Sequence, residues 1–133
     1  MITKGDEVID RHKVLLFLHL MKMAAHERFV FTNRAKNLET LASLGITREH
    51  AESLVLGMQP GNYVSGPDRD RNDPSLEMWV FGLRVASSEV YVKLQVISDP
   101  PVQCVCVSFH EPERPMRYPL REAGPPANEE ESR

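Results

Sequence analysis

The sequence predicts an α+β fold in which N-terminal helices pack on one face of an antiparallel β-sheet. Apolar residues recur at helical spacing through the first half of the chain, whereas the second half alternates apolar and polar residues with a period of two. Helices that precede strands in this way are typical of α+β domains. The 133 residues suit a single domain. We expect this domain to span residues 1–121 and residues 122–133 to form an acidic, flexible tail.

The first predicted helix covers residues 7–26, with Asp6 as its N-cap. It is apolar on nearly all sides between Val14 and Ala24, so we expect it to be largely buried. Three histidines recur along it at seven-residue intervals, which predicts one solvated stripe: His12, His19 and His26.

A short strand and two further helices are expected next. Arg28–Thr32 is aromatic and β-branched, which favours a strand. Asn33–Leu44 has apolar residues at helical spacing and ends at Gly45. Thr47 is a suitable N-cap for a third helix that continues to Leu56.

The second half of the chain is expected to form the sheet. Extended structure begins at Tyr63–Ser65 and is followed by a polar loop over residues 66–76. Three strands then follow: Met78–Val85, Val90–Ile97 and Val102–Phe109.

Residue alternation assigns the side chains of the last two strands to faces of the sheet. The apolar set must pack on the helices, and in the last strand this set is Val105, Val107 and Phe109. By the same alternation Cys104 and Cys106 share the opposite face. That face is expected to be open and to carry five polar side chains: Tyr91, Lys93, Gln95, Ser108 and His110.

The segment after the last strand carries charged and aromatic residues separated by prolines. Three prolines hold the chain extended, so Arg114, Arg117 and Tyr118 are expected to flank the open face at low entropic cost. A tyrosine, a lysine, a histidine and two arginines on one face suit phosphodiester chemistry. The alternative to a phosphodiester site is a sheet face that is merely solvated, followed by a proline-rich segment without a binding role.

Composition limits the function classes. The net charge of −3 argues against a broad, sequence-independent DNA binder but permits a local phosphate site. The two cysteines are expected to be small buried hydrophobes, since neither has further zinc ligands at suitable spacing. We expect no metal site and no cofactor. No apolar run approaches the ~20 residues of a membrane span and no signal peptide is visible, so a cytoplasmic protein without membrane contact is expected.

Several short motifs resemble the MqsR-type toxins of bacterial toxin–antitoxin systems, within the RelE-like ribonuclease group. The resemblance lies in EVYVKLQVI followed by VCVSFHE, with FVFTNRAKNLETLASLGI, GMQPGNYVS and MWVF upstream in the same order. It covers about residues 14–111. It implies a RelE-like fold and an endoribonuclease that cleaves mRNA, blocks translation and growth, and is silenced by a partner antitoxin.

The resemblance also implies roles for individual residues. The catalytic tyrosine of the family matches Tyr91, and its final basic residue matches His110. Two positions depart from the family, because Val64 stands where a lysine is expected and Val80 where a glutamine is expected.

The resemblance, together with these residues, implies metal-independent RNA cleavage, in which the 2′-hydroxyl is the nucleophile. We expect Tyr91 and His110 to act as the acid and the base, in an order that stays open, and Lys93 to stabilise charge on the phosphate. Tyr91 could instead orient the phosphate. The expected substrate-binding residues are Arg114, Arg117, Tyr118, Gln95 and Ser108. For Tyr118 the alternative is a packing anchor for the C-terminal segment.

Two other functions remain open at the level of the sequence. The first is a catalytically inactive relative that acts as a protein- or RNA-binding regulatory module, which the departures at Val64 and Val80 favour. The second is an unrelated α+β interaction domain with a merely solvated face.

Overall fold

The computed structural model describes residues 10–121. The predicted helix start at residue 7, its Asp6 cap and the acidic tail therefore lie outside the described residues. The helices are α2 (Arg11–Glu27), α3 (Ala35–Leu44), α4 (Arg48–Leu56) and a short 3₁₀ turn, η1 (Pro60–Asn62). The strands are β1 (Phe29–Phe31), β2 (Tyr63–Arg69), β3 (Glu77–Val85), β4 (Ser88–Ile97) and β5 (Gln103–His110). Within residues 10–121, none of the helices has the length and apolar character that a bilayer crossing requires.

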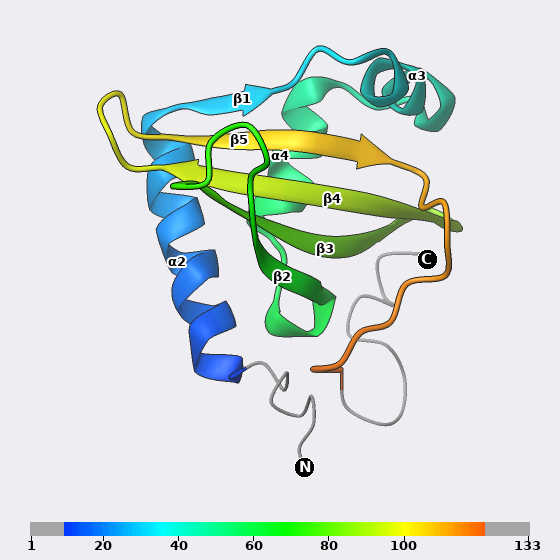
Figure 1. The fold of residues 1–133 in the computed structure, drawn as a ribbon. Coiled ribbons are helices and arrows are strands. Elements are labelled where there is room, and N and C mark those ends of the chain that lie inside the picture. Colours follow the sequence, from blue (N-terminus) through cyan, green and yellow to red (C-terminus); the bar gives the residue numbers. More distant parts are fainter. Residues whose placement is uncertain (1–9, 122–133) are drawn as a thin grey trace.

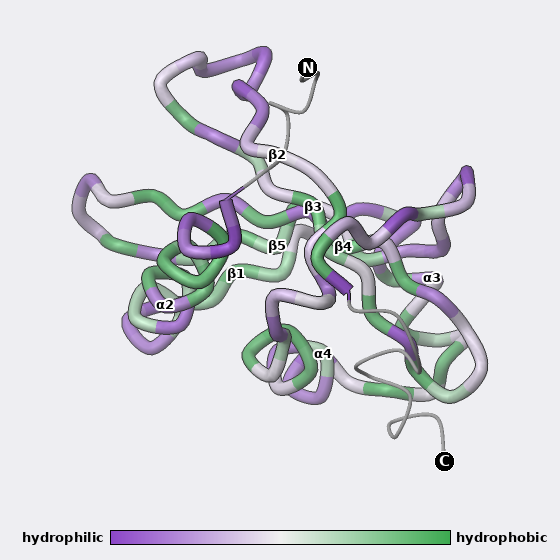
Figure 2. Tube along the Cα trace, turned by 90° about the horizontal axis from the view of Figure 1, so that it is seen from below, coloured by the Kyte–Doolittle hydropathy of each residue, from purple (hydrophilic) through white to green (hydrophobic). Residues whose placement is uncertain are grey.

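One five-stranded sheet, in the order β1-β5-β4-β3-β2, forms the centre of the molecule. All neighbouring strands are antiparallel except β1, which runs parallel to β5. The helix α2 packs against β4 and β5, α3 against β5, and α4 against β1 (Figure 1). Figure 2 shows α2 and α4 on one side of the sheet. The predicted α+β fold is confirmed, with helices on a mostly antiparallel sheet as in RelE-like folds.

The core lies between α2 and the sheet. Asp10 caps α2 by accepting a hydrogen bond from the backbone of His12, so the described helix begins at Arg11. The ring of Phe17 stacks on Trp79, with 4.5 Å between ring centroids, and also on Phe81. Aromatic stacking of this kind adds to the stabilisation from apolar burial.

The prediction of a polar loop over residues 66–76 is wrong for the first part of that segment, because β2 continues to Arg69. Gly66 makes this possible: it has φ +109°, and a Cβ there would lie 2.7 Å from the carbonyl oxygen of Met78 on β3. Only glycine combines that backbone conformation with such close strand packing.

The face assignment of β5 is correct at its end and wrong before it. Lys93 pairs with Ser108, whereas its neighbour Leu94 pairs with Cys106, so Val107 is an extra residue in a β-bulge. The bulge reverses the alternation. The side chains of Cys104 and Cys106 are therefore buried in the core, as expected of cysteines that act as small hydrophobes. Val105 and Val107, predicted to pack on the helices, are only partly buried.

The buried amide of Asn37 on α3 fixes the bulge. Its Nδ2 donates to the carbonyl oxygens of Thr32 (3.0 Å) and Val107 (3.1 Å), and its Oδ1 accepts from the backbone N–H of Phe109 (2.9 Å). Asn37 thus satisfies backbone groups on both sides of the bulge, beyond the end of the β1–β5 ladder. This contact determines where the last residues of β5 lie.

Candidate functional site

The two predicted catalytic rings lie side by side on the face of the sheet opposite α2. Tyr91 of β4 and His110 of β5 are direct cross-strand partners. Their rings stack with 5.3 Å between centroids and an interplanar angle of 19°. Both side chains are partly exposed, so a ligand can reach them.

The hydrogen bond of His110 assigns its tautomer. The Nδ1 atom lies 2.9 Å from the backbone carbonyl oxygen of Glu111. Because a carbonyl oxygen only accepts hydrogen bonds, Nδ1 carries the hydrogen, which places the lone pair of the neutral imidazole on Nε2. The Nε2 atom is thus the one that can accept a hydrogen bond or a proton from a ligand.

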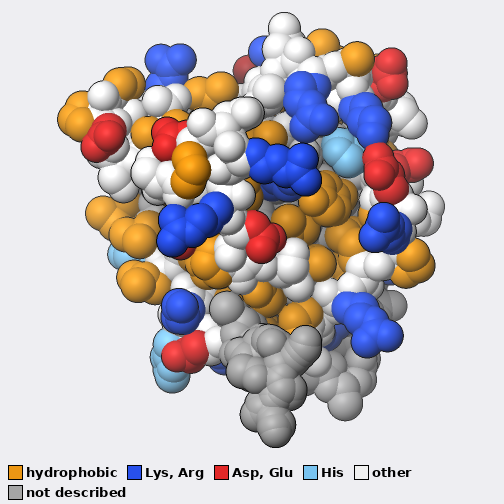
Figure 3. Space-filling view, viewed as in Figure 1, with side chains coloured by type: hydrophobic (Ala, Val, Ile, Leu, Met, Phe, Trp, Pro, Cys, Tyr) orange, Lys and Arg blue, Asp and Glu red, His pale blue; other side chains and the backbone are white. Residues whose placement is uncertain are grey.

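A groove of about 580 Å³ runs past this pair of rings. Its lining comes from the start of α3, from β2, β4 and β5, and from the segment after β5. Among residues 10–121, five cationic side chains line it against a single carboxylate, that of Glu113: Arg34, Lys36, Lys93, Arg114 and Arg117. Figure 3 shows Lys and Arg side chains gathered around a histidine on this face. The lining favours an anionic ligand, although the whole chain carries a net charge of −3.

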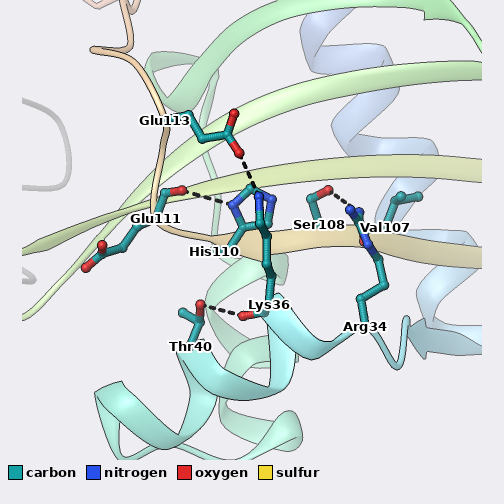
Figure 4. A network of polar contacts seen from close by, with 8 residues as sticks. All are labelled: Arg34, Lys36, Thr40, Val107, Ser108, His110, Glu111 and Glu113. Atoms are coloured by element: carbon teal, nitrogen blue, oxygen red, sulfur yellow. Dashed lines mark hydrogen bonds and ion pairs between the residues drawn. The ribbon is translucent and has the colours of Figure 1, made fainter.

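Arg34 precedes α3 and is held against the end of β5. Its Nη1 atom donates to the Ser108 hydroxyl (3.0 Å) and to the carbonyl oxygen of Val107 (3.3 Å) (Figure 4). Ser108 is only 3% exposed, and its cross-strand partner is Lys93. The serine therefore positions the arginine beside Lys93 and offers little surface of its own to a ligand.

A salt bridge crosses the groove near the histidine. The ammonium of Lys36 lies 2.6 Å from a carboxylate oxygen of Glu113, joining α3 to the segment after β5 (Figure 4). The Lys36 ammonium holds the pKa of Glu113 below its usual value. Both side chains are largely exposed, so solvent weakens the pair and it can open.

Two predicted binding residues lie away from the groove. Gln95 is 6% exposed, because its amide donates to Asp70 (2.9 Å) in the segment after β2. Tyr118 donates its hydroxyl to Glu89 (2.8 Å), and its ring lies against Gly82, where a Cβ would collide with it. Burial, followed by the bond to Glu89, raises the pKa of Tyr118. The contacts indicate that Gln95 anchors the β2–β3 connection and that Tyr118 anchors the C-terminal segment.

The sequence analysis missed Arg34, Lys36 and Glu113 as groove residues. Arg34 and Lys36 reach the groove because β1 runs parallel to β5, so the chain leaves β1 at the same end of the sheet where β5 ends. Such long-range parallel pairing leaves no local signal in the sequence. The one signal in the sequence was the pair of basic residues in TNRAK, which stands at the end of the predicted short strand.

Comparisons with known proteins add no assignment. Neither a family model, nor a curated protein, nor a solved structure matches this chain. Without a match, the site is interpreted from its own geometry.

Within residues 10–121, no three His, Cys, Asp or Glu side chains are grouped so that they could hold a metal ion.

Proposed function

We propose that this chain is a metal-independent endoribonuclease that cleaves mRNA, and that it is the toxin of a bacterial toxin–antitoxin system of the MqsR type. The observation that carries the proposal is the stacked Tyr91–His110 pair, which lies in a groove lined by five cationic side chains. RNA cleavage through the 2′-hydroxyl needs a base, an acid and cations around one phosphate. The groove offers all three kinds of group.

The roles follow from the hydrogen-bonding capacity of each side chain. With Nδ1 held by the Glu111 carbonyl oxygen, Nε2 of His110 can accept the proton of the 2′-hydroxyl or, when protonated, donate one to the leaving 5′-oxygen. A tyrosine hydroxyl can donate a hydrogen bond, so Tyr91 is assigned as a donor to the phosphate or to the leaving group. We therefore favour His110 as the base and Tyr91 as the acid.

The cations bind and stabilise the phosphate. Lys93 pairs with Ser108 across the strands, and Ser108 binds Arg34, so both cations are placed beside the two rings. A guanidinium can bind a phosphate through two parallel hydrogen bonds, which suits Arg34 to the scissile phosphate. Arg114 and Arg117, on the segment after β5, are placed to hold neighbouring phosphates.

The alternative is a binding module that lacks catalysis. Val64 lines the groove at a position where the family resemblance implies a lysine, so that cation is missing here. In this alternative the groove binds RNA and leaves it intact. The same experiment separates the two functions.

The test is cleavage of a labelled single-stranded RNA in excess EDTA, with binding measured in parallel. We expect the wild type to cut the RNA and His110→Ala to lose about 10²- to 10⁴-fold in rate, the usual contribution of a general acid or base. Tyr91→Phe should lower the rate strongly while the RNA still binds. His50→Ala, an exposed histidine on α4, is the matched control and should retain the wild-type rate.

Growth arrest on induction extends the test to cells, where the proposal expects a cytoplasmic protein acting on mRNA. Wild-type protein that binds RNA without cutting it, with or without ribosomes, would leave the binding module as the function. Intact RNA together with no binding would overturn both.

A further inference from the structure

A second hollow, of about 400 Å³, adjoins the groove at the salt bridge between Lys36 and Glu113. Of the described residues, three line both spaces: Lys36, His110 and Glu113. Figure 4 shows the salt bridge beside the ring of His110. Because both side chains of the pair are largely exposed, the pair can open. The groove and the hollow then form one continuous channel that passes His110.

The walls of the hollow are polar and its base is apolar. One face of α3 supplies four polar residues at a spacing of i, i+3, i+4 and i+7: Lys36, Glu39, Thr40 and Ser43. Ser88 of β4 and Glu111, which follows β5, also line the hollow. At its base lie Val90, which is 0% exposed, and the partly buried Leu44. An apolar base with a polar rim suits a flat ring that has polar edges, and the volume is typical of small-ligand pockets, which measure roughly 300–1,000 Å³.

The hollow and the groove differ in charge. Among residues 10–121, three carboxylates line the hollow against the single ammonium of Lys36: Glu39, Glu111 and Glu113. The groove has five cations against one carboxylate. The phosphates of an RNA strand are therefore attracted to the groove and repelled from the hollow. The part of a nucleotide that suits the hollow is its uncharged base.

The roles proposed for the two rings identify the nucleotide. With His110 as the base, the ribose whose 2′-hydroxyl attacks lies beside His110. With Tyr91 as the acid, the leaving 5′-oxygen lies beside Tyr91. The hollow is lined by His110, whereas Tyr91 lines only the groove. The hollow therefore adjoins the nucleotide on the 5′ side of the cut.

We propose that the hollow binds the base of the nucleotide that supplies the 2′-hydroxyl, and that it selects bases with an exocyclic amino group over uracil. This proposal rests on the proposed function, since its ligand is the RNA substrate. Within residues 10–121, the carboxylates of Glu39 and Glu111 make no hydrogen bond or ion pair. An ionised carboxylate only accepts hydrogen bonds, so it binds an amino group and repels a carbonyl oxygen. Glutamate reads cytosine in this way, through the amino group that uracil lacks.

The experiment replaces the base on the 5′ side of a mapped cut by an analogue without the amino group. Uracil replaces cytosine, or hypoxanthine replaces a purine, in an otherwise identical RNA. We expect the wild type to cut the analogue at least tenfold more slowly. The double variant Glu39→Gln/Glu111→Gln should reduce this difference to less than about threefold, because a glutamine amide can also donate a hydrogen bond. Glu49→Gln, an exposed glutamate on α4, is the matched control and should keep the full difference.

A second variant tests the hollow itself. Ser43→Phe places a ring in the hollow from an exposed position on α3 and should lower kcat/KM at least tenfold. Ser53→Phe, at an exposed position on α4, should leave it unchanged, and circular dichroism verifies that both variants keep their helices. Equal rates for the base and its analogue in the wild type, or a wild-type rate in Ser43→Phe, would overturn the proposal while the endoribonuclease stands. RNA that the wild type leaves intact would overturn the proposed function, and this subsite with it.

Discussion

Removal of the Asn37 side-chain amide should destabilise the fold more than any change at the exposed groove residues. Asn37 is 0% exposed and makes three hydrogen bonds, two to carbonyl oxygens and one from the backbone N–H of Phe109. In Asn37→Ala the Phe109 N–H loses its acceptor in a buried position, which alone costs about 1–3 kcal/mol. Loss of the two donated bonds and the small cavity add to this, so we expect about 2–4 kcal/mol in total.

Urea denaturation of Asn37→Ala and of the wild type measures this difference. Asn33→Ala is the control, because Asn33 is exposed and accepts a hydrogen bond from the exposed Arg48 side chain. This substitution should cost less than about 0.5 kcal/mol. A loss below about 1 kcal/mol for Asn37→Ala would refute the idea that this amide holds the bulge. A large loss with an unchanged Tyr91–His110 contact, read from aromatic NMR shifts, would show that the amide stabilises the fold without positioning the site.

Three further predictions concern titrating groups. Burial raises the pKa of both thiols, that of Cys104 to about 12, so neither should react with a thiol reagent at pH 8 until the protein is unfolded. Lys36 lowers the pKa of Glu113, so their pair stabilises the protein above the unfolded-state pKa of the carboxyl, and this stabilisation is lost as the pH falls. Glu113→Gln should abolish that acid dependence of stability. Because the substitution frees Lys36, it should also tighten RNA binding about two- to fivefold in low salt. Burial and Glu89 raise the pKa of Tyr118, so the stability that its hydroxyl contributes is present below about pH 10 and is lost as the pH rises above it. Tyr118→Phe should lower the free energy of unfolding by about 1 kcal/mol in urea denaturation. It should also remove a late tyrosinate step from the absorbance titration.

The local periodicity of apolar residues was sufficient to predict the order of the helices and strands. Residue spacing placed three helices before the meander, and the predicted strands lie within one or two residues of β3, β4 and β5. Hydrophobic alternation also placed Tyr91, Lys93 and His110 on one face, and the structure brings them together. These features depend on side-chain period alone, which a single sequence contains.

The remaining features depend on pairing between distant segments. The bulge at Val107 is a register shift against Lys93 and Leu94, and strand alternation carries no information about it. The same shift is the reason that Cys106 faces the core although Ser108, two residues later, faces the groove. Parallel pairing of β1 with β5, which delivers Arg34 to the site, is equally invisible in local sequence.

The chemical groups at the RNA ends show whether cleavage proceeds through the 2′-hydroxyl. We expect the wild type, in excess EDTA, to leave a 2′,3′-cyclic phosphate and a 5′-hydroxyl, and a 2′-deoxy substitution at the cut position to block the reaction. Ends that carry a 5′-phosphate, or cleavage that persists at a 2′-deoxy position, would contradict a mechanism in which His110 and Tyr91 act on the 2′-hydroxyl.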